Sequence, residues 1–167
     1  QFCWLSAVIF FQKSKFKMIT ISHSEKETRN FACQLLKSYQ GQLFDHCLVL
    51  ALEGEFGSGK TVFAKGVGEA LGIKKIIRSP SFIIQKEFPY VLGKLKGTFY
   101  HLDLWRMEKE EEIENLKLEK LFQPGSVILI EWAEKISDKT KVFENNNIIL
   151  VKIKIKFIDK KTRNIQF

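Results

Sequence analysis

Two continuous apolar runs dominate the hydrophobic pattern of the chain. Residues 47–52 (CLVLAL) and residues 127–130 (VILI) contain no polar or charged side chain apart from a thiol. Runs of this length are typical of strands that are buried on both faces of a parallel sheet. We therefore predict that both segments are central strands of an α/β fold.

A further strand is predicted where the pattern changes to strict alternation. Apolar side chains occupy positions 151, 153, 155 and 157, and lysines occupy positions 152, 154 and 156. This alternation indicates a half-buried strand over residues 149–157. We interpret its lysine face as the protection of an edge strand against aggregation rather than as a binding surface.

Weaker signals predict the remaining elements. Ser24 and Glu27 form a capping box, which predicts a helix from there to about residue 39. Helices are also expected at residues 61–71 and 108–122, and strands at residues 18–22, 82–88 and 98–104, with residues 90–97 as a hairpin connection. Together these elements predict one domain over residues 18–160, followed by a tail at residues 161–167.

Residues 1–17 do not share this pattern. Positions 2–11 are almost wholly apolar and positions 12–17 are basic. Such a run is too short to span a bilayer, and positive charges that follow an apolar run are the reverse of a secretory signal. We interpret residues 1–17 as an extraneous or disordered extension before a natural start at Met18. A short membrane-associating extension is the alternative.

Composition bounds the class of protein and its partners. Of the 167 residues, 45% are hydrophobic and 28% are charged, which is ordinary for a soluble globular protein. The net charge is +8, and residues 139–167 contain eight basic and two acidic residues. A basic surface suits a polyanion such as RNA, although lysines also keep a small protein soluble. Three widely spaced cysteines, Cys3, Cys33 and Cys47, predict neither a zinc site nor a disulfide framework and fit a cytosolic compartment.

The clearest chemical motif lies directly after the first apolar run. Residues 54–61 read GEFGSGKT, the G-x-x-x-x-G-K-T pattern of a phosphate-binding loop, between a predicted strand and a predicted helix. Glycines allow successive backbone N–H groups to point at a phosphate, Lys60 adds a charge for the outer phosphates, and Thr61 offers a hydroxyl to Mg²⁺. The alternative is a glycine-rich turn with an incidental lysine.

Two carboxylates follow predicted strands and so occupy the positions that a nucleotide site requires. Glu131 ends the run at residues 127–130, as a Walker-B acid would, and Asp103 ends the strand at residues 98–104. The carboxyl ends of neighbouring parallel strands meet beside such a loop. The alternative for Glu131 is a surface acid at a strand end, and the alternative for Asp103 is a helix N-cap or turn residue.

Other polar residues near these acids allow two interpretations each. His101 should share a strand face with Asp103 and is more often a packed, hydrogen-bonded histidine than a catalyst. Arg106 fits either neutralisation of phosphate charge or an ion pair with the acidic run at residues 108–114. Ser79 and Ser81 flank Pro80 and fit either a nucleotide-sensing loop or ordinary turn chemistry.

Absent motifs narrow the class of enzyme. The chain contains no N-K-x-D guanine-reading motif, which disfavours a GTPase, and no second glycine-rich lid of a small-molecule kinase. The paired acids disfavour a module that binds a nucleotide without turnover. An ATPase is thus favoured, with a small-molecule kinase and a non-hydrolysing binding module as the alternatives.

Five motifs together resemble one family. The segments GEFGSGKT (54–61), SPSF (79–82), HLDLWR (101–106), EEIE (111–114) and IEWAE (130–134) occur in the order and at the spacing of the TsaE (YjeE) family. These proteins are small P-loop ATPases of bacterial tRNA threonylcarbamoyladenosine synthesis. The likeness runs from about Met18 to Lys135. It implies a P-loop NTPase-type three-layer α/β sandwich, with a mixed, mainly parallel central sheet and antiparallel C-terminal strands.

The resemblance also implies roles for individual residues. The cofactors would be ATP and Mg²⁺, with Thr61 and Glu131 at the metal and Asp103 needed for hydrolysis. Trp132 and Glu134 match a second switch region, residues 79–82 match a first one, and Ser24 matches a position near the nucleotide. The phosphate cradle would comprise Glu55, Phe56, Gly57, Ser58, Gly59 and Lys60.

The partners implied by the resemblance are the TsaD and TsaB proteins, which form the transferase. ATP hydrolysis would reset that assembly, tRNA would be met only through the complex, and the setting would be cytoplasmic without stable membrane association.

The sequence departs from the family at three positions. Trp105 replaces a usual Tyr and loses its hydroxyl, Ser81 replaces a usual Thr and keeps its hydroxyl, and Lys117 stands where Gly is common after the acidic helix.

Overall fold

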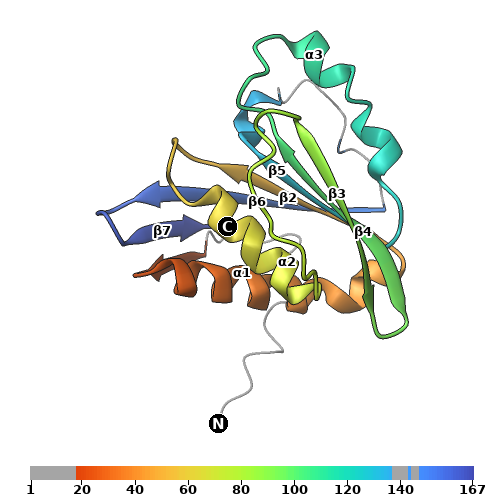
Figure 1. The fold of residues 1–167 in the computed structure, drawn as a ribbon, viewed down its shortest axis with the longest axis horizontal. Coiled ribbons are helices and arrows are strands. Elements are labelled where there is room, and N and C mark those ends of the chain that lie inside the picture. The colour runs from red at the N-terminus through yellow and green to blue at the C-terminus, as the bar shows by residue number, and fades with distance from the viewer. Residues whose placement is uncertain (1–17, 137–142, 144–146) are drawn as a thin grey trace.

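The computed structural model describes residues 18–136, 143 and 147–167, and the expectation for residues 1–17 lies outside this part of the chain. Within it, seven strands form one sheet in the order β1-β7-β6-β2-β5-β4-β3 (Figure 1). The strands are β1 (Ile19–Ser22), β2 (Cys47–Glu53), β3 (Gln85–Leu92), β4 (Leu95–Asp103), β5 (Ser126–Glu131), β6 (Ile148–Phe157) and β7 (Arg163–Gln166).

The centre of the sheet is parallel and its margins are antiparallel. β6, β2, β5 and β4 are joined by parallel pairings. β3 pairs antiparallel with β4, β7 with β6, and β1 with β7. The predicted mixed sheet with antiparallel C-terminal strands is therefore confirmed. Because β2, β5 and β4 run in one direction, their carboxyl ends lie at the same edge of the sheet.

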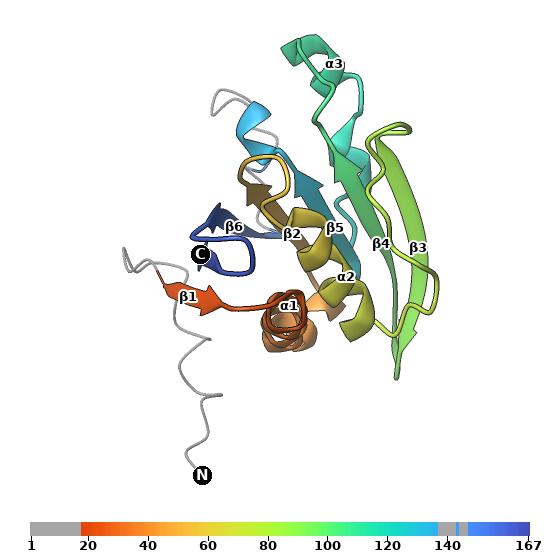
Figure 2. The same ribbon diagram turned by 60° about the vertical axis from the view of Figure 1, so that its left-hand side comes forward.

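Helices cover both faces of the sheet. α1 (Glu25–Tyr39) and α2 (Lys60–Ala70) lie side by side over one face (Figure 2). α3 (Glu110–Glu114) and the 3-10 turn η4 (Leu118–Leu121) contribute to the hydrophobic cluster on the other face. Alternate residues of β5 are buried in the two different clusters, which confirms the three layers and explains the apolar run. Two further 3-10 turns are η3 (Gln40–Phe44) and η5 (Ala133–Lys135).

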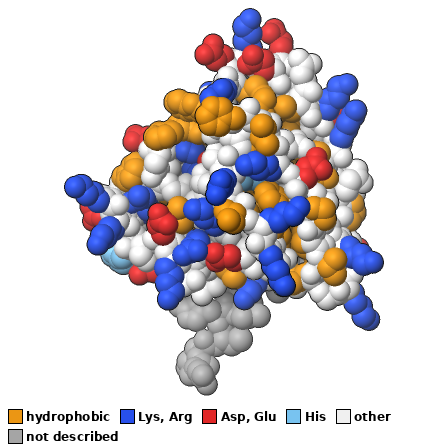
Figure 3. All heavy atoms as spheres, viewed as in Figure 1, with side chains coloured by type: hydrophobic (Ala, Val, Ile, Leu, Met, Phe, Trp, Pro, Cys, Tyr) orange, Lys and Arg blue, Asp and Glu red, His pale blue; other side chains and the backbone are white. Residues whose placement is uncertain are grey.

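The surface charge is dispersed on the face drawn in Figure 3. Acidic side chains gather over α3, while Lys and Arg side chains are spread over the rest of this face. The positive charge is therefore not collected in one groove on this side of the molecule. None of the helices in the described residues combines the length and the apolar content needed to cross a membrane.

Two expectations about the C-terminal strands are wrong. β6 pairs with both β2 and β7 and is not an edge strand. Its lysines are exposed because only the face toward α1 and α2 is covered along this part of the strand. Alternation of apolar and polar residues therefore shows that one face of a strand is covered, and it does not show that a neighbouring strand is missing. The expected tail contains β7, in which Ile165 is fully buried. A single apolar residue among polar neighbours is too weak a signal to predict a strand.

The strand predicted at residues 82–88 is displaced along the chain. Residues 81–83 form a turn, Ile84 has a φ of 66°, and β3 then continues through Pro89 to Leu92. Proline is tolerated there because β3 lies at the edge of the sheet, where a missing N–H does not break the ladder. The expected connection at residues 90–97 is therefore mostly strand.

The helix predicted at residues 108–122 is interrupted. α3 ends at Glu114, and Lys117 adopts a left-handed conformation with a φ of 50° before η4 begins. This conformation suits glycine, so the departure at Lys117 keeps the turn at a cost in backbone strain. The helical period of the sequence did not reveal this break.

Close contact between α1 and α2 depends on Gly66. A Cβ atom at this position would lie 2.3 Å from the Arg29 backbone oxygen and 2.9 Å from the Ala32 Cβ. The absent side chain therefore allows the two helices to approach closely. This approach positions the start of α2, and with it the end of the loop at residues 54–61.

We predict that Gly66→Ala lowers the free energy of unfolding by about 1–3 kcal/mol, because the new methyl group overpacks the helix contact. In an open helix, the same change would instead stabilise by up to about 1 kcal/mol. Gly41→Ala is the matched control, since a Cβ at Gly41 meets nothing within 4 Å. Urea unfolding of both variants measures the difference. Equal stabilities for the two variants would contradict the packing argument.

Candidate functional site

The loop between β2 and α2 has the backbone of a phosphate-binding loop. Gly57 and Gly59 have φ values of 73° and 109°, which a residue with a Cβ adopts only with strain. Gly59 is the N-cap of α2 and has no side chain that could accept a hydrogen bond from the first N–H groups of that helix. The Ser58 hydroxyl is buried, and no described group bonds to it. The glycine-rich loop and its position between strand and helix are as predicted.

Lys60 is a buried cation held by the loop itself. Its Nζ donates to the backbone carbonyl oxygens of Gly54 at 2.7 Å and Glu55 at 3.0 Å. It also lies 3.9 Å from the centroid of the Trp132 ring. Only 4% of the residue is exposed. Burial lowers the pKa of the Lys60 ammonium from its ordinary value, because desolvation disfavours the charged form. The carboxylates that oppose this shift are Glu131, Glu134 and Asp103.

Glu131 joins the loop to the sheet. The Thr61 Oγ1 donates to Glu131 Oε1 at 2.9 Å, with Oε2 at 3.3 Å, and His101 Nε2 lies 2.8 Å from Oε1. His101 is fully buried, and no described group bonds to its Nδ1. A histidine beside a carboxylate is best satisfied when Nε2 carries the proton. His101 is thus the hydrogen-bonded core histidine of the first interpretation, and its partner Glu131 lies on the neighbouring strand.

Asp103 is buried beside Glu131 and is held by a turn. The two acids are paired in the register of β4 and β5. Ser79 Oγ donates to Asp103 Oδ2 at 2.6 Å, Ser81 Oγ donates to the same oxygen, and the Trp105 N–H donates to Oδ1 at 3.0 Å. The predicted serine turn and the predicted acid therefore form one unit. These hydrogen bonds fix the orientation of the Asp103 side chain.

An aromatic rim borders the loop. The Phe56 and Trp105 ring centroids are 6.2 Å apart, and those of Trp105 and Trp132 are 4.7 Å apart. Phe56 is 80% exposed and Trp105 is 46% exposed, so part of this apolar surface faces solvent. We define Phe56, Trp105 and Trp132 as the aromatic rim. Trp105 contacts both of the other rings of this rim.

Two predicted residues do not join this arrangement as expected. The Arg106 guanidinium lies over the Phe82 ring at 4.5 Å, a contact that neither interpretation of Arg106 anticipated. Ser24 caps α1 by accepting from the Glu27 N–H at 3.2 Å. This confirms the helix start, and the hydrogen bonds recorded for Ser24 stay within the corner between β1 and α1.

Sequence reasoning missed one residue that contacts the loop. Arg163 lies at the start of β7, and its Nε donates to the backbone carbonyl oxygen of Ser58 at 2.8 Å. The sequence pattern predicts a tail at residues 161–167, which gives Arg163 no expected neighbour. Its charge among several basic neighbours was the only signal, and it did not distinguish Arg163 from the others.

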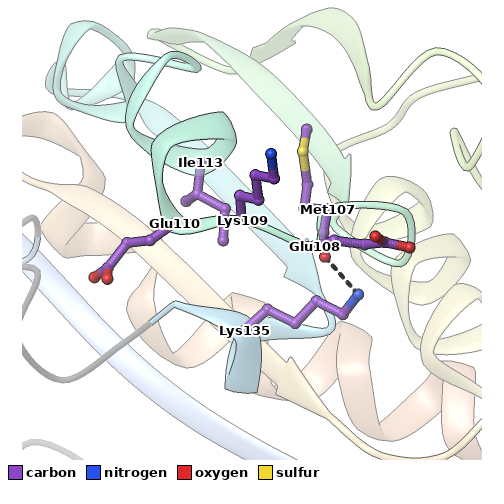
Figure 4. Close-up of a pocket in the computed structure, with 6 residues that line it drawn as sticks. All are labelled: Met107, Glu108, Lys109, Glu110, Ile113 and Lys135. Atoms are coloured by element: carbon purple, nitrogen blue, oxygen red, sulfur yellow. Dashed lines mark hydrogen bonds between the residues drawn. The ribbon is translucent and has the colours of Figure 1, made fainter.

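A surface hollow of about 460 Å³ lies beside α3 rather than at the loop (Figure 4). Met107 and Ile113 provide its apolar lining, and charged side chains provide the rest. Lys135 crosses it and donates to the Met107 oxygen at 2.7 Å. The hollow contains no residue of the loop, of the paired acids or of the serine turn. We therefore do not assign the nucleotide to it.

The oxygen-rich side chains at the loop fit Mg²⁺ bound together with a phosphate. The Thr61 hydroxyl and the Glu131 carboxylate supply two hard donors. The described residues contain no group of three or more His, Cys, Asp or Glu side chains that could hold a metal alone. Mg²⁺ sites of nucleotide enzymes use one or two protein oxygens and complete the shell with phosphate and water. The buried ammonium, the orphaned Ser58 hydroxyl and the uncapped start of α2 fit the anion.

Comparisons with known proteins identify relatives of this chain. Residues 22–165 match the family model described as "Threonylcarbamoyl adenosine biosynthesis protein TsaE". Several relatives carry the name "tRNA threonylcarbamoyladenosine biosynthesis protein TsaE". The one from Bacillus subtilis (strain 168) is 47% identical over 91 residues, covering 54% of each chain. The one from Rickettsia bellii (strain RML369-C) is 36% identical over 149 residues, covering 87% of this chain and 92% of that protein.

A relative of the same name from Haemophilus influenzae is 32% identical over 107 residues, which cover 64% of this chain and 63% of that protein. The chain thus aligns with about half to two thirds of the Bacillus and Haemophilus relatives. A solved structure titled "Crystal structure of Bacillus subtilus YdiB" is 30% identical, with a TM-score of 0.56. The alignment covers 91% of this chain and 84% of the chain in that structure. The P-loop NTPase-like fold is shared.

We predict that Thr61→Val lowers the free energy of unfolding by about 1–2 kcal/mol, because it removes a hydrogen bond to the buried Glu131 carboxylate without changing the shape of the side chain much. Thr61→Ser keeps the hydroxyl and is the control, with a loss below about 0.5 kcal/mol. Urea unfolding without nucleotide gives both values. A Val variant as stable as the Ser variant would rule out a stabilising contact.

Proposed function

Because the chain belongs to the TsaE family, we propose that it is an ATP-hydrolysing accessory protein for threonylcarbamoyl modification of the adenosine next to the anticodon in tRNA. It would act on the TsaD–TsaB transferase complex and would not itself transfer the threonylcarbamoyl group. The setting would be cytoplasmic, and tRNA would be met through the complex. ATP and Mg²⁺ are the proposed cofactors.

The observation that carries the proposal is the convergence of four groups on one loop. The Lys60 ammonium, the Thr61–Glu131 hydrogen bond, the Asp103 carboxylate and the start of α2 all lie at the carboxyl ends of parallel strands. Separately, each group has a structural explanation. Together they supply a cation, two hard oxygen donors and a second carboxylate beside an anion-binding helix terminus.

Each residue has a defined part in this proposal. When bound, ATP supplies the phosphoanhydride bond, and Mg²⁺ supplies the positive charge that its cleavage requires. Lys60 and the backbone N–H groups of residues 55–59 would hold the phosphates, and Thr61 and Glu131 would hold the metal. Lys60 would then exchange the Gly54 and Glu55 carbonyls for charged phosphate oxygens, which are the stronger acceptors.

Asp103 would orient the attacking water and accept its proton. Its carboxylate is fixed by Ser79, Ser81 and the Trp105 N–H, and it lies beside Glu131 in the sheet register. A general base needs a defined position before it needs a shifted pKa. The serine turn supports that position. Through this turn, the state of the nucleotide would be linked to the exposed Phe82, which follows Ser81.

The aromatic rim supports action through a partner rather than on a small molecule. Phe56 and Trp105 are exposed beside the loop, and Trp132 joins the rim to the Lys60 ammonium. Exposed aromatic surface of this kind marks a site of protein contact. A change in the position of Lys60 would therefore reach a surface that the TsaD–TsaB complex can contact.

We expect weak ATP hydrolysis by the protein alone, stimulation by the TsaD–TsaB complex, and a loss of about 100-fold or more in Lys60→Ala, the size that removal of one preorganised electrostatic group produces. Lys65→Ala is the control, since it removes a lysine from the same helix, five positions after Lys60. A phosphate-release assay with each variant measures the rates.

Two results would replace the proposal. Nucleotide binding without hydrolysis, even with both partners present, would establish a binding module. Transfer of the γ-phosphoryl group to a metabolite would instead establish a small-molecule kinase.

A further inference from the structure

Arg163 connects the C-terminal hairpin to the phosphate loop. Figure 1 shows the β6–β7 hairpin beside the connection from β2 to α2. The Arg163 Nε donates to the Ser58 backbone oxygen at 2.8 Å, across 105 positions of sequence. A Cβ built on Gly59 would lie 3.8 Å from Nε, and one on Gly57 would lie 3.4 Å from the Phe157 ring. The loop thus rests directly on the hairpin.

The hairpin holds the guanidinium in one orientation. Arg163 Nη1 donates to the backbone carbonyl oxygens of Asp159 at 3.0 Å and Thr162 at 3.1 Å. The guanidinium carbon lies 4.4 Å from the centroid of the Phe157 ring. The Asp159 carboxylate accepts from the N–H groups of Lys161 and Thr162, both at 2.8 Å, and so fixes the turn. Arg163 is therefore oriented by contacts other than the one it makes to the loop.

The contact to Ser58 determines the direction of the next N–H group. In a planar trans peptide, the C=O of one residue and the N–H of the next point in opposite directions. The chain has no cis peptide among its described residues, so a Ser58 oxygen directed at Arg163 sends the Gly59 N–H away from the hairpin. In the described residues, no acceptor is recorded for that N–H. The Gly59 N–H is thus available to a ligand at the start of α2.

We propose that Arg163 is a positioning residue for the phosphates of a nucleoside di- or triphosphate. It acts through the backbone: it clamps the Ser58 carbonyl outward and thereby aims the Gly59 N–H into the phosphate cradle. This proposal rests on the proposed function and adds a residue to its site. Arginine suits the task because its planar fork engages Ser58 through Nε and the hairpin through Nη1 at the same time.

The test compares nucleotide binding of Arg163→Gln with that of Lys161→Gln, which removes the same charge from the same hairpin turn. Calorimetric titration with ADP, ATP and inorganic pyrophosphate should give affinities about tenfold weaker for Arg163→Gln, the loss typical of one charge-assisted hydrogen bond. Lys161→Gln should stay within about twofold of the natural sequence. Without nucleotide, the ¹⁵N–¹H resonance of Gly59 should shift in Arg163→Gln and not in Lys161→Gln.

Arg163→Lys separates orientation from charge. Lysine keeps the positive charge but cannot bond to Ser58 and to both hairpin carbonyls at once, so affinity should recover only in part. Full recovery would overturn the positioning role in favour of simple electrostatic attraction. Unchanged affinity and an unshifted Gly59 resonance in Arg163→Gln would overturn the contact's role altogether. The Lys variant and the resonance also give an answer if the Gln variant folds poorly.

The outcome for the proposed function is read separately. If the natural sequence binds none of the three ligands, the proposed nucleotide site fails, and this inference fails with it. If Lys60→Ala abolishes binding while all Arg163 variants bind normally, the nucleotide site stands and only the Arg163 clamp is rejected.

Discussion

The site depends on how the protein compensates for burying the Lys60 ammonium. A buried charge without partners costs several kcal/mol, so its surroundings must supply them. Gly54 and Glu55 offer carbonyl oxygens, Trp132 offers the face of its ring, and among the carboxylates Glu131 most strongly favours the charged form of Lys60. These partners constrain the loop, the end of β5 and the aromatic rim at once. The arrangement keeps a cation inside the loop and close to where phosphate charge would be bound.

The parallel centre of the sheet brings the acids to that cation. β2 leads into the loop, β5 ends at Glu131 and β4 ends at Asp103, and all three strands run in the same direction. Thr61, on the first turn of α2, then reaches Glu131 across the edge of the sheet. The loop with the first turn of α2, the end of β5 and the end of β4 therefore meet at one edge of the sheet. The antiparallel hairpin of β6 and β7 closes the other side of the loop through Arg163.

The sequence allowed prediction where the signal was local. The apolar runs, the capping box at Ser24 and the glycine-rich loop each depend on a few neighbouring residues, and the structure contains all three. Prediction failed where the answer depends on distant contacts. The β6 lysines did not reveal that β7 pairs beside them, and the strand signal around Ile165 was too weak. The pairing of Asp103 with the serine turn also came from tertiary structure.

The most direct test of the central claim is a structure of the protein with Mg²⁺ and a non-hydrolysable ATP analogue. The account predicts that Lys60 Nζ leaves the Gly54 and Glu55 carbonyls for phosphate oxygens, with the metal beside Thr61 and Glu131. It also predicts that the Gly59 N–H bonds to a phosphate. A nucleotide bound elsewhere, with Lys60 still on the two carbonyls, would contradict the account.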